Sequence, residues 1–192
     1  MKKFLTLLLL ILIASILGGI YGMLHDQITY TISEEYYTKF KFIQFGIDSR
    51  GLGNNIGTDL QPEIILRNPR FGVGIVGVLA TWWVGLFIGI ILSFVGLIHK
   101  NASQMFRVTI KSLALTLLIA LAVGCMGLLY GHFVLIDNIP NWHYPGNLID
   151  MDHFIMVGSM HNFSYLGGLI GLAAAIVYSV RKAKMQNKVL VR

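Results

Sequence analysis

The chain has 192 residues, of which 55% are hydrophobic and only 12% are charged. A water-soluble domain of this length cannot bury so much apolar surface, so the composition excludes a soluble globular protein and favours an integral membrane protein. The formal net charge of +6 is informative mainly through the positions of the charges along the chain.

Four stretches of the chain are long enough to cross a bilayer as helices. A hydrocarbon core of roughly 30 Å needs about 20 helical residues, and none of the four stretches contains Asp, Glu, Lys or Arg. Helices fit better than barrel strands, which are shorter and alternate polar with apolar residues. The sequence therefore predicts an all-α membrane protein, a four-transmembrane-helix bundle that forms a single integral membrane domain over residues 1–192. The predicted spans are 4–24, 71–98, 113–136 and 154–180.

The first span has an alternative interpretation as a cleaved signal peptide, because Lys2 and Lys3 precede a leucine-rich run. Two features favour a retained span. The apolar run continues to Leu24, beyond the usual signal-peptide core of about 7–15 residues. In addition, no small-x-small cleavage site closes the run, since Ala14 and Ser15 lie too early to serve as one.

Basic and acidic residues lie on opposite sides of the predicted spans. Ten of the fifteen basic residues precede the first span, lie between the second and third, or follow the fourth, where 181–192 form a basic tail. All nine acidic residues lie in the other two connections. Because basic loops stay in the cytoplasm, the sequence predicts a multi-pass protein of the bacterial cytoplasmic (inner) membrane with both termini cytoplasmic. The basic tail is expected to contact anionic lipids, and no nucleic-acid surface is expected.

The first outer segment, 25–70, is predicted to contain a short amphipathic helix at the membrane interface. Ser33 is a typical helix cap, and the following Glu34 and Glu35 suit the positive end of a helix. The stretch 36–42 then mixes aromatic residues with lysines, as in helices that lie flat at the level of the lipid headgroups. After Gly46 the composition is typical of a loop.

Each predicted span carries two glycines four residues apart, at 18 and 22, 85 and 89, 127 and 131, and 167 and 171. This spacing places both glycines on one helix face and lets helix backbones approach closely. We therefore expect the spans to form one compact bundle.

Five of the six histidines are predicted on the outer side of the membrane. With a helix rise of about 1.5 Å per residue, His161 lies about 10 Å and His132 about 6 Å inside the outer ends of their spans. Ionisable groups at such depths are costly unless they are paired, and they mark functional sites. The other three outer histidines are His25, which ends the first span, His143 and His153.

We interpret this gathering as a metal- or haem-binding site at the outer face of the bundle. Carboxylates commonly orient metal-bound imidazoles, so acidic residues near the histidines belong to the expected site. The methionines at 156 and 160 lie beside the histidine face of the fourth span, and a sulfur-plus-imidazole set suits copper or haem iron. The alternative is that these methionines only fill the bundle interior. The expected cofactor is a transition metal (zinc, copper or iron) or haem. The expected ligands are His25, His132 and His161, with His153 in reserve and Asp26 and Glu35 as orienting or ligating carboxylates.

Two points about this site stay open in the sequence. Adjacent helical residues point about 100° apart, so His25 and Asp26 are expected to face one centre only if the helix breaks between them. A histidine network held together by hydrogen bonds, without a metal, is the alternative to a metal site.

Two functions of other classes also stay open. A small transporter component is disfavoured, because transporter sites usually lie near mid-membrane and no charged residue marks a path through the inner half of the spans. An accessory or assembly subunit would use the basic tail and the aromatic outer segment as surfaces for a membrane-protein partner. The sequence contains no phosphate-binding or hydrolase motif, so it assigns no catalytic residue, substrate or reaction.

Several segments resemble a family of uncharacterised bacterial multi-pass membrane proteins. The sequences HDQIT at 25–29 and EYYT at 35–38 match that family's HDQ-x-T and EY-[FY]-T motif after the first span. ATWWVGL at 80–86 and SYLGG at 164–168 look like its second and last spans, so the resemblance covers most of the chain. Family members carry Gly-His-Pro after EY-[FY]-T, whereas this chain has KFKF, so no ligand is expected there. The resemblance implies the four-span architecture and singles out His25, Asp26, Gln27, Thr29, Glu35 and Tyr36.

Overall fold

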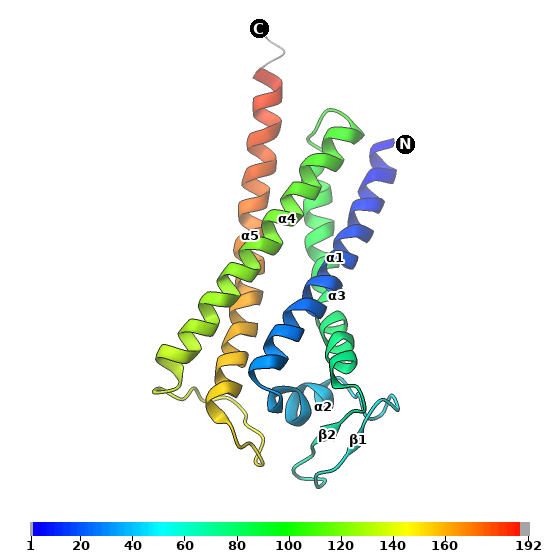
Figure 1. Cartoon of the computed structure of the whole chain (residues 1–192). Helices are drawn as coiled ribbons and strands as arrows, with labels where there is room; N and C mark the ends of the chain where they lie inside the picture. Colours follow the sequence, from blue (N-terminus) through cyan, green and yellow to red (C-terminus); the bar gives the residue numbers. More distant parts are fainter. Residues whose placement is uncertain (1, 189–192) are drawn as a thin grey trace.

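The structure, a computed structural model, describes residues 2–188 and the side chains of residues 2–185. The end of the predicted basic tail, which includes Arg192, lies outside the described residues. Four helices are long and apolar enough to cross a membrane, which confirms the four predicted spans and is compatible with a multi-pass membrane protein. They are α1 (Lys2–Ile32), α3 (Pro69–Gly96), α4 (Ala102–Tyr130), which continues into the π-helical segment η2 (Gly131–Leu135), and α5 (Met151–Lys188) (Figure 1).

The helices extend beyond the apolar stretches that predicted them. The first span was predicted to end at residue 24, but α1 continues to Ile32 because polar residues interrupt the apolar run without breaking the helix. Side-chain caps fix the starts of α3 and α4. The Asn68 side chain accepts a hydrogen bond from the Phe71 amide, and the Asn101 side chain accepts one from the Gln104 amide. An apolar stretch therefore predicts which part of a helix suits the hydrocarbon core of a membrane. The capping residues show where the helix begins.

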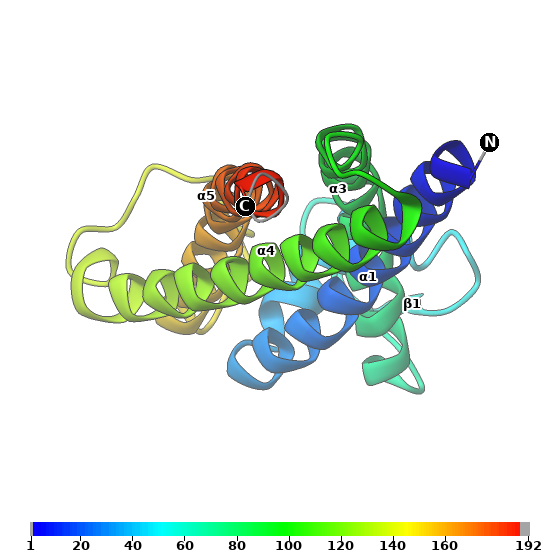
Figure 2. The same ribbon diagram turned by 90° about the horizontal axis from the view of Figure 1, so that it is seen from above.

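The four long helices form two hairpins. α1 packs along α3, and α4 packs along α5, whereas contacts between the two pairs are fewer (Figures 1 and 2). Glycines line both intimate contacts. A Cβ on Gly22 would lie 2.2 Å from the Gly77 carbonyl oxygen, and a Cβ on Gly171 would lie 2.8 Å from the Thr116 carbonyl oxygen. The glycine spacing thus produces two tight pairs, in place of the single compact bundle that we expected.

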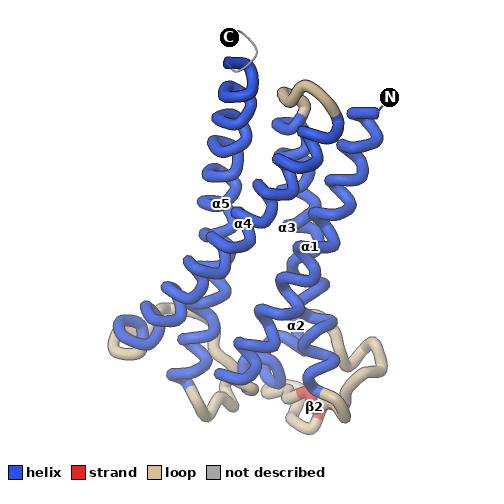
Figure 3. Tube along the Cα trace, turned by 45° about the horizontal axis from the view of Figure 1, so that its top comes forward, coloured by secondary structure: helices blue, strands red, loops and turns tan. Residues whose placement is uncertain are grey.

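The two ends of the molecule differ in structure (Figure 3). At one end, here called the terminal end, lie the start of α1, the short α3–α4 turn and the end of α5. The opposite end, here called the loop end, carries the two long connections 33–68 and 136–150. The loop end corresponds to the side predicted to face outward, and its orientation in a membrane stays a prediction.

The first long connection folds back against the hairpins. It contains a helical stretch made of the π-helical segment η1 (Tyr37–Lys41) and α2 (Phe42–Gln44), and the Ser33 hydroxyl accepts a hydrogen bond from the Tyr36 amide at its start, as predicted. A two-residue antiparallel ladder between β1 (Asn54–Asn55) and β2 (Ile64–Ile65) closes the rest of the loop.

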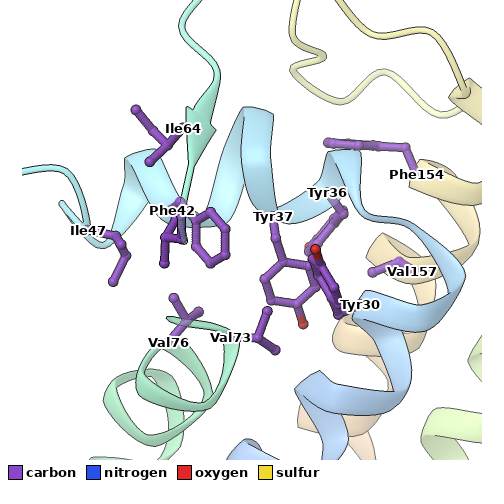
Figure 4. Packing of buried hydrophobic residues seen from close by; sticks show 11 residues of the cluster. Tyr30, Tyr36, Tyr37, Phe42, Ile47, Ile64, Val73, Val76, Phe154 and Val157 are labelled. Carbon is purple, nitrogen blue, oxygen red and sulfur yellow. The ribbon is translucent and has the colours of Figure 1, made fainter. Parts of the chain in front are cut away.

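The aromatic side chains of this helical stretch are buried inside the protein. Tyr36, Tyr37 and Phe42 pack in the largest hydrophobic core cluster, which Figure 4 shows between the first connection, the start of α3 and the start of α5. Phe154 and Val157 contribute the α5 side of this cluster. The core therefore fastens both hairpins at the loop end, and the placement of the stretch at a membrane interface stays a prediction.

Candidate metal centre

Three ionisable side chains from the two hairpins meet near the loop end. His25 and Asp26 come from α1 and His161 comes from α5, and each has a ligand atom within 4.8 Å of those of the other two. All three are buried, with exposed fractions of 4%, 3% and 8%. This group, here called the buried cluster, contains three of the six residues that the sequence singled out as ligands or orienting carboxylates.

The spacing within the buried cluster is close to that of a metal-ligand set. The His25 Nδ1 atom lies 3.3 Å and the His161 Nδ1 atom 4.0 Å from the Asp26 Oδ1 atom. Around a tetrahedral ion with metal–ligand bonds of about 2.1 Å, the ligand atoms are about 3.4 Å apart. The His25 Nδ1 and Asp26 Oδ1 atoms form a hydrogen bond with each other, so an ion bound between these donors would replace that bond.

The expectation that His25 and Asp26 could share a centre only across a break in the helix is wrong. α1 is continuous from Lys2 to Ile32, yet both side chains are buried and reach the same place. The angle of about 100° describes where adjacent Cα–Cβ bonds point. Two side chains of this length can still bring their end atoms close together. Here the ligand atoms of both lie within 4.8 Å of those of His161 on α5.

Two polar atoms of the buried cluster have no hydrogen-bond partner among the described residues. They are Nε2 of His161 and Oδ2 of Asp26. Leaving a buried polar group without a partner costs about 1–3 kcal/mol, and more for a charged group. His25 differs, because its Nε2 atom lies 2.9 Å from the Ser164 hydroxyl of α5, which fixes the orientation of its ring. The cluster thus combines one oriented imidazole with two donor atoms that remain free to bind a ligand.

Aromatic rings enclose the buried cluster. The Tyr36 ring stacks on the His161 imidazole with ring centroids 5.1 Å apart, and the Tyr21 ring lies 5.6 Å from the His25 imidazole. Burial, reinforced by the negative charge of Asp26, raises the pKa of both Tyr36 and Tyr37, so these phenols stay protonated near neutral pH. These tyrosines exclude water and add no formal charge to the site.

One cation lies close to this aromatic enclosure. Lys41 is buried, and its ammonium group lies 5.5–5.8 Å from the ring centroids of Phe40, Phe45 and Tyr36. Burial lowers the pKa of Lys41, and attraction to Asp26 acts in the opposite direction. A cation–π setting of this kind stabilises an ammonium ion that has lost part of its hydration.

Glu35 serves a different purpose in the structure from the one predicted. Its carboxylate accepts hydrogen bonds from the Lys39 ammonium, from the Ile149 amide at 3.2 Å and from the Asp150 amide at 2.7 Å. Lys39 also donates to the Asn147 carbonyl oxygen at 2.8 Å. This Glu35–Lys39 pair fastens the first long connection to the second, immediately before α5 begins.

The other predicted histidines lie outside the buried cluster. His132 is exposed in η2, where its ring packs 4.6 Å from Phe133, and His143 is exposed in the second connection. His153 is about half exposed, and its Nδ1 atom lies 2.7 Å from the Asp150 carboxylate, which also accepts a hydrogen bond from the His153 amide. The structure therefore brings together His25, Asp26 and His161 and separates them from the rest of the predicted set.

Sequence reasoning missed two residues near the site. Tyr21 precedes His25 by four residues and so shares its helix face, a spacing that could have revealed it. Lys41 was interpreted as an interfacial cation, and no local pattern predicts that a lysine will be buried. Tyr36 was singled out by the family resemblance through the EYYT segment, and Ser164 begins the SYLGG segment of the same resemblance.

Searches of protein-family models, curated proteins and solved structures find no match to this chain. The family resemblance described above therefore stays a prediction, and the functional argument depends on the residues of the site.

Proposed function

We propose that this chain is a multi-pass protein of the bacterial inner membrane that binds one transition-metal ion through His25, Asp26 and His161. In this proposal the loop end faces outward, and the site lies inside the bundle near that face. The observation that carries the proposal is the convergence of these three buried donors within 4.8 Å, two of them with an unpartnered polar atom.

The donor set indicates the class of ion and its chemistry. Two imidazole nitrogens and one carboxylate oxygen suit zinc, iron or copper, and three protein ligands leave at least one coordination position for a substrate or water. Closed structural zinc sites use four protein ligands instead. An ion held in this way would act as a Lewis acid or redox centre toward a molecule that enters the site.

A single ion fits the site better than haem. The His25 and His161 rings have centroids 4.8 Å apart and are tilted by 57°. A porphyrin plane held between two imidazoles would need the rings on opposite faces of a flat space, and Asp26 lies beside both rings in this site.

Metal analysis of the detergent-purified protein tests the proposal. We expect about one equivalent of a transition metal in the unmodified protein and in His153→Ala, which removes an exposed imidazole near the same end of α5. We expect loss of the metal in Asp26→Asn and in His161→Ala. Circular dichroism of each variant shows whether the helices are retained.

Added Co²⁺ gives a second readout, because its visible spectrum reports the number and type of ligands. Weaker and shifted absorption bands are expected in Asp26→Asn, and unchanged bands in His153→Ala. Equal metal content and identical Co²⁺ spectra in all folded variants would overturn the ligand set.

A further inference from the structure

A cavity of about 440 Å³ lies between the two hairpins and ends at the buried cluster. All four long helices contribute to its wall. Most of the lining is apolar, with Leu17 from α1, Ile88 from α3, Leu117 from α4 and Leu172 from α5 as examples. Its volume lies within the range of roughly 300–1,000 Å³ that is typical of sites for small ligands.

Polar groups gather in the part of this cavity near the loop end. His25, Asp26 and His161 line it together with the hydroxyl-bearing Ser164 and Tyr165. Tyr21 also lines the cavity. The rest of the wall comes from all four long helices and is mostly hydrocarbon, apart from the threonines at 81 and 116 and the indole of Trp83. The cavity therefore has the polarity of an amphiphile, with a polar head region and a longer apolar region.

The cavity opens sideways, between α3 and α5. Phe87 of α3 and Leu169 of α5 line it and are at the same time 58% and 67% exposed on the surface of the molecule. Residues that line it from α1 and α4, such as Ala14 and Leu113, are buried. Figure 2 shows α3 and α5 apart on one side, with α1 and α4 crossing on the other. At the depth of the spans, such an opening leads into lipid.

Charge restricts the head group. Among the described residues that line the cavity, Asp26 is the only one with a formal charge, and no lysine or arginine contributes to the wall. In the cavity without a metal ion, a phosphate or carboxylate head would therefore meet the Asp26 carboxylate, and the nearby Lys41 does not line the wall. Imidazole and hydroxyl groups instead suit an uncharged oxygen, which can both accept and donate hydrogen bonds.

We propose that the cavity binds one uncharged lipid with a hydroxyl or carbonyl head group, which enters from the bilayer between α3 and α5. The head contacts the buried cluster and Ser164, and the chain lies along the apolar wall. Water is a poor occupant of the apolar part, since it needs two to four polar partners. The choice of an uncharged head group is argued for the cavity without a metal ion. If an ion is bound as proposed above, the oxygen of the head group would face its open coordination position.

Photolabelling tests the occupant. The protein is reconstituted in phosphatidylcholine vesicles that contain oleyl alcohol with a diazirine in its chain, irradiated and digested for peptide mass spectrometry. Labelling is expected at Leu113, which is only 4% exposed and cannot be reached from the surrounding bilayer, and at Leu117. Unlabelled oleyl alcohol should compete for these positions, and oleyl phosphate should not.

A pair of variants on α5 gives the matched comparison. Gly168 lines the cavity and has no atom within 4 Å of where its Cβ would lie. We therefore expect Gly168→Phe to occupy part of the cavity, with circular dichroism to show that the helices are retained. We expect loss of labelling at Leu113 in Gly168→Phe and full labelling in Leu166→Phe, which alters a lipid-exposed position outside the cavity.

Three outcomes would overturn the inference: labelling confined to exposed positions, equal labelling in both variants, or equal competition by the phosphate. Chelator-treated protein is labelled in parallel. If metal analysis finds no ion in the purified protein but Leu113 is labelled, this inference is supported and the metal proposal fails. If the purified protein contains the metal but Leu113 is not labelled, the metal proposal is supported and the lipid inference fails.

Discussion

Glu35 and Lys39 connect the two hairpins at the loop end, although neither belongs to a spanning helix. The Lys39 side chain is only 4% exposed, and its ammonium group pairs with the Glu35 carboxylate and lies 3.9 Å from the Glu63 carboxylate. Removing Glu35 leaves the buried ammonium with the more distant partner, which weakens its compensation. The Glu35 carboxylate also binds the two amides that precede α5, so its removal affects the start of that helix.

We predict that Glu35→Ala lowers the free energy of unfolding by about 1–3 kcal/mol. The Lys39 ammonium then keeps only the more distant Glu63 carboxylate, and the amides of Ile149 and Asp150 lose their acceptor. Thermal unfolding of the detergent-solubilised protein measures the effect. Asp48→Ala removes an exposed carboxylate from the same connection and should leave the melting temperature unchanged. Faster amide hydrogen exchange at Ile149 and Asp150 should accompany the loss. Equal melting temperatures for the two variants would contradict this role of Glu35.

The Glu35–Lys39 pair also predicts a pH dependence. Burial alone would raise the pKa of Glu35, but hydrogen bonds from Lys39 and from the amides of Asp150 and Ile149 lower it below its ordinary value of 4.5. A carboxyl group with a depressed folded-state pKa stabilises the protein above its unfolded pKa and loses that contribution as the pH falls. The stability difference between the unmodified protein and Glu35→Gln should therefore be full near neutrality and shrink below about pH 4.5. A difference that is constant from pH 7 to pH 3 would refute this account.

Individual site residues were predictable where the sequence placed them at an unusual depth. His161 stood out because ionisable groups are rare inside apolar helices, and the structure confirms that it is buried. The same argument selected His132, which is exposed, whereas the buried Asp26 was predicted in the outer segment. The function of Glu35 was not predictable, because its partners Ile149 and Asp150 are backbone amides more than a hundred residues away in sequence. Backbone donors carry no sequence signal.

The α1–α3 contact depends on the absence of side chains at its glycines. At Gly22 a Cβ would lie 2.2 Å from both the Gly77 carbonyl oxygen and the Thr81 hydroxyl oxygen. The Gly77 oxygen belongs to the α3 backbone and cannot rotate away, so α1 and α3 would have to separate to admit the Cβ. At Gly168 on α5, by contrast, no atom lies within 4 Å of where a Cβ would be, so a side chain meets no obstacle there.

We predict that Gly22→Ala destabilises the protein by about 1–3 kcal/mol through overpacking. Gly168→Ala should be neutral or stabilising by up to about 1 kcal/mol, because alanine is the better helix former and nothing opposes it. Resistance to unfolding in sodium dodecyl sulfate, followed by circular dichroism, compares the two variants. Equal resistance of the Gly22→Ala and Gly168→Ala variants to sodium dodecyl sulfate would contradict the prediction that the close contact between α1 and α3 requires a glycine at position 22.

The sequence predicts which segments form helices better than it predicts which helices pack together. The four spans follow from the apolar windows alone, and the structure confirms them. The same glycine spacing occurs in all four spans, so it could not indicate which helices pair. The wider turns of η1 and η2 were also not predictable, because π-helical geometry reflects local packing more than residue type.

The proposed topology puts the two ends of the molecule on opposite sides of the membrane. Leu60, 94% exposed in the first connection, and Lys100, exposed in the α3–α4 turn, lie at these two ends. In a Cys125→Ser background, a membrane-impermeant maleimide added to intact spheroplasts should label Leu60→Cys and leave Lys100→Cys unmodified. In inverted membrane vesicles the pattern should be reversed. Labelling of both positions from one side would refute the four-span topology.

The division of the buried cluster between α1 and α5 affects how the protein is made. α1 is synthesised first, and with it His25 and Asp26, whereas His161 and Ser164 follow more than a hundred residues later. At a translation rate of about 5–20 residues per second, the carboxylate waits for several seconds before its last partners exist. The groups around the carboxylate that are already made in that interval include Tyr21, Tyr36, Tyr37 and Lys41. Biogenesis of this protein therefore includes a stage at which an acidic first helix must be held in place, by its own aromatic segment or by the insertion machinery, until the last helix arrives.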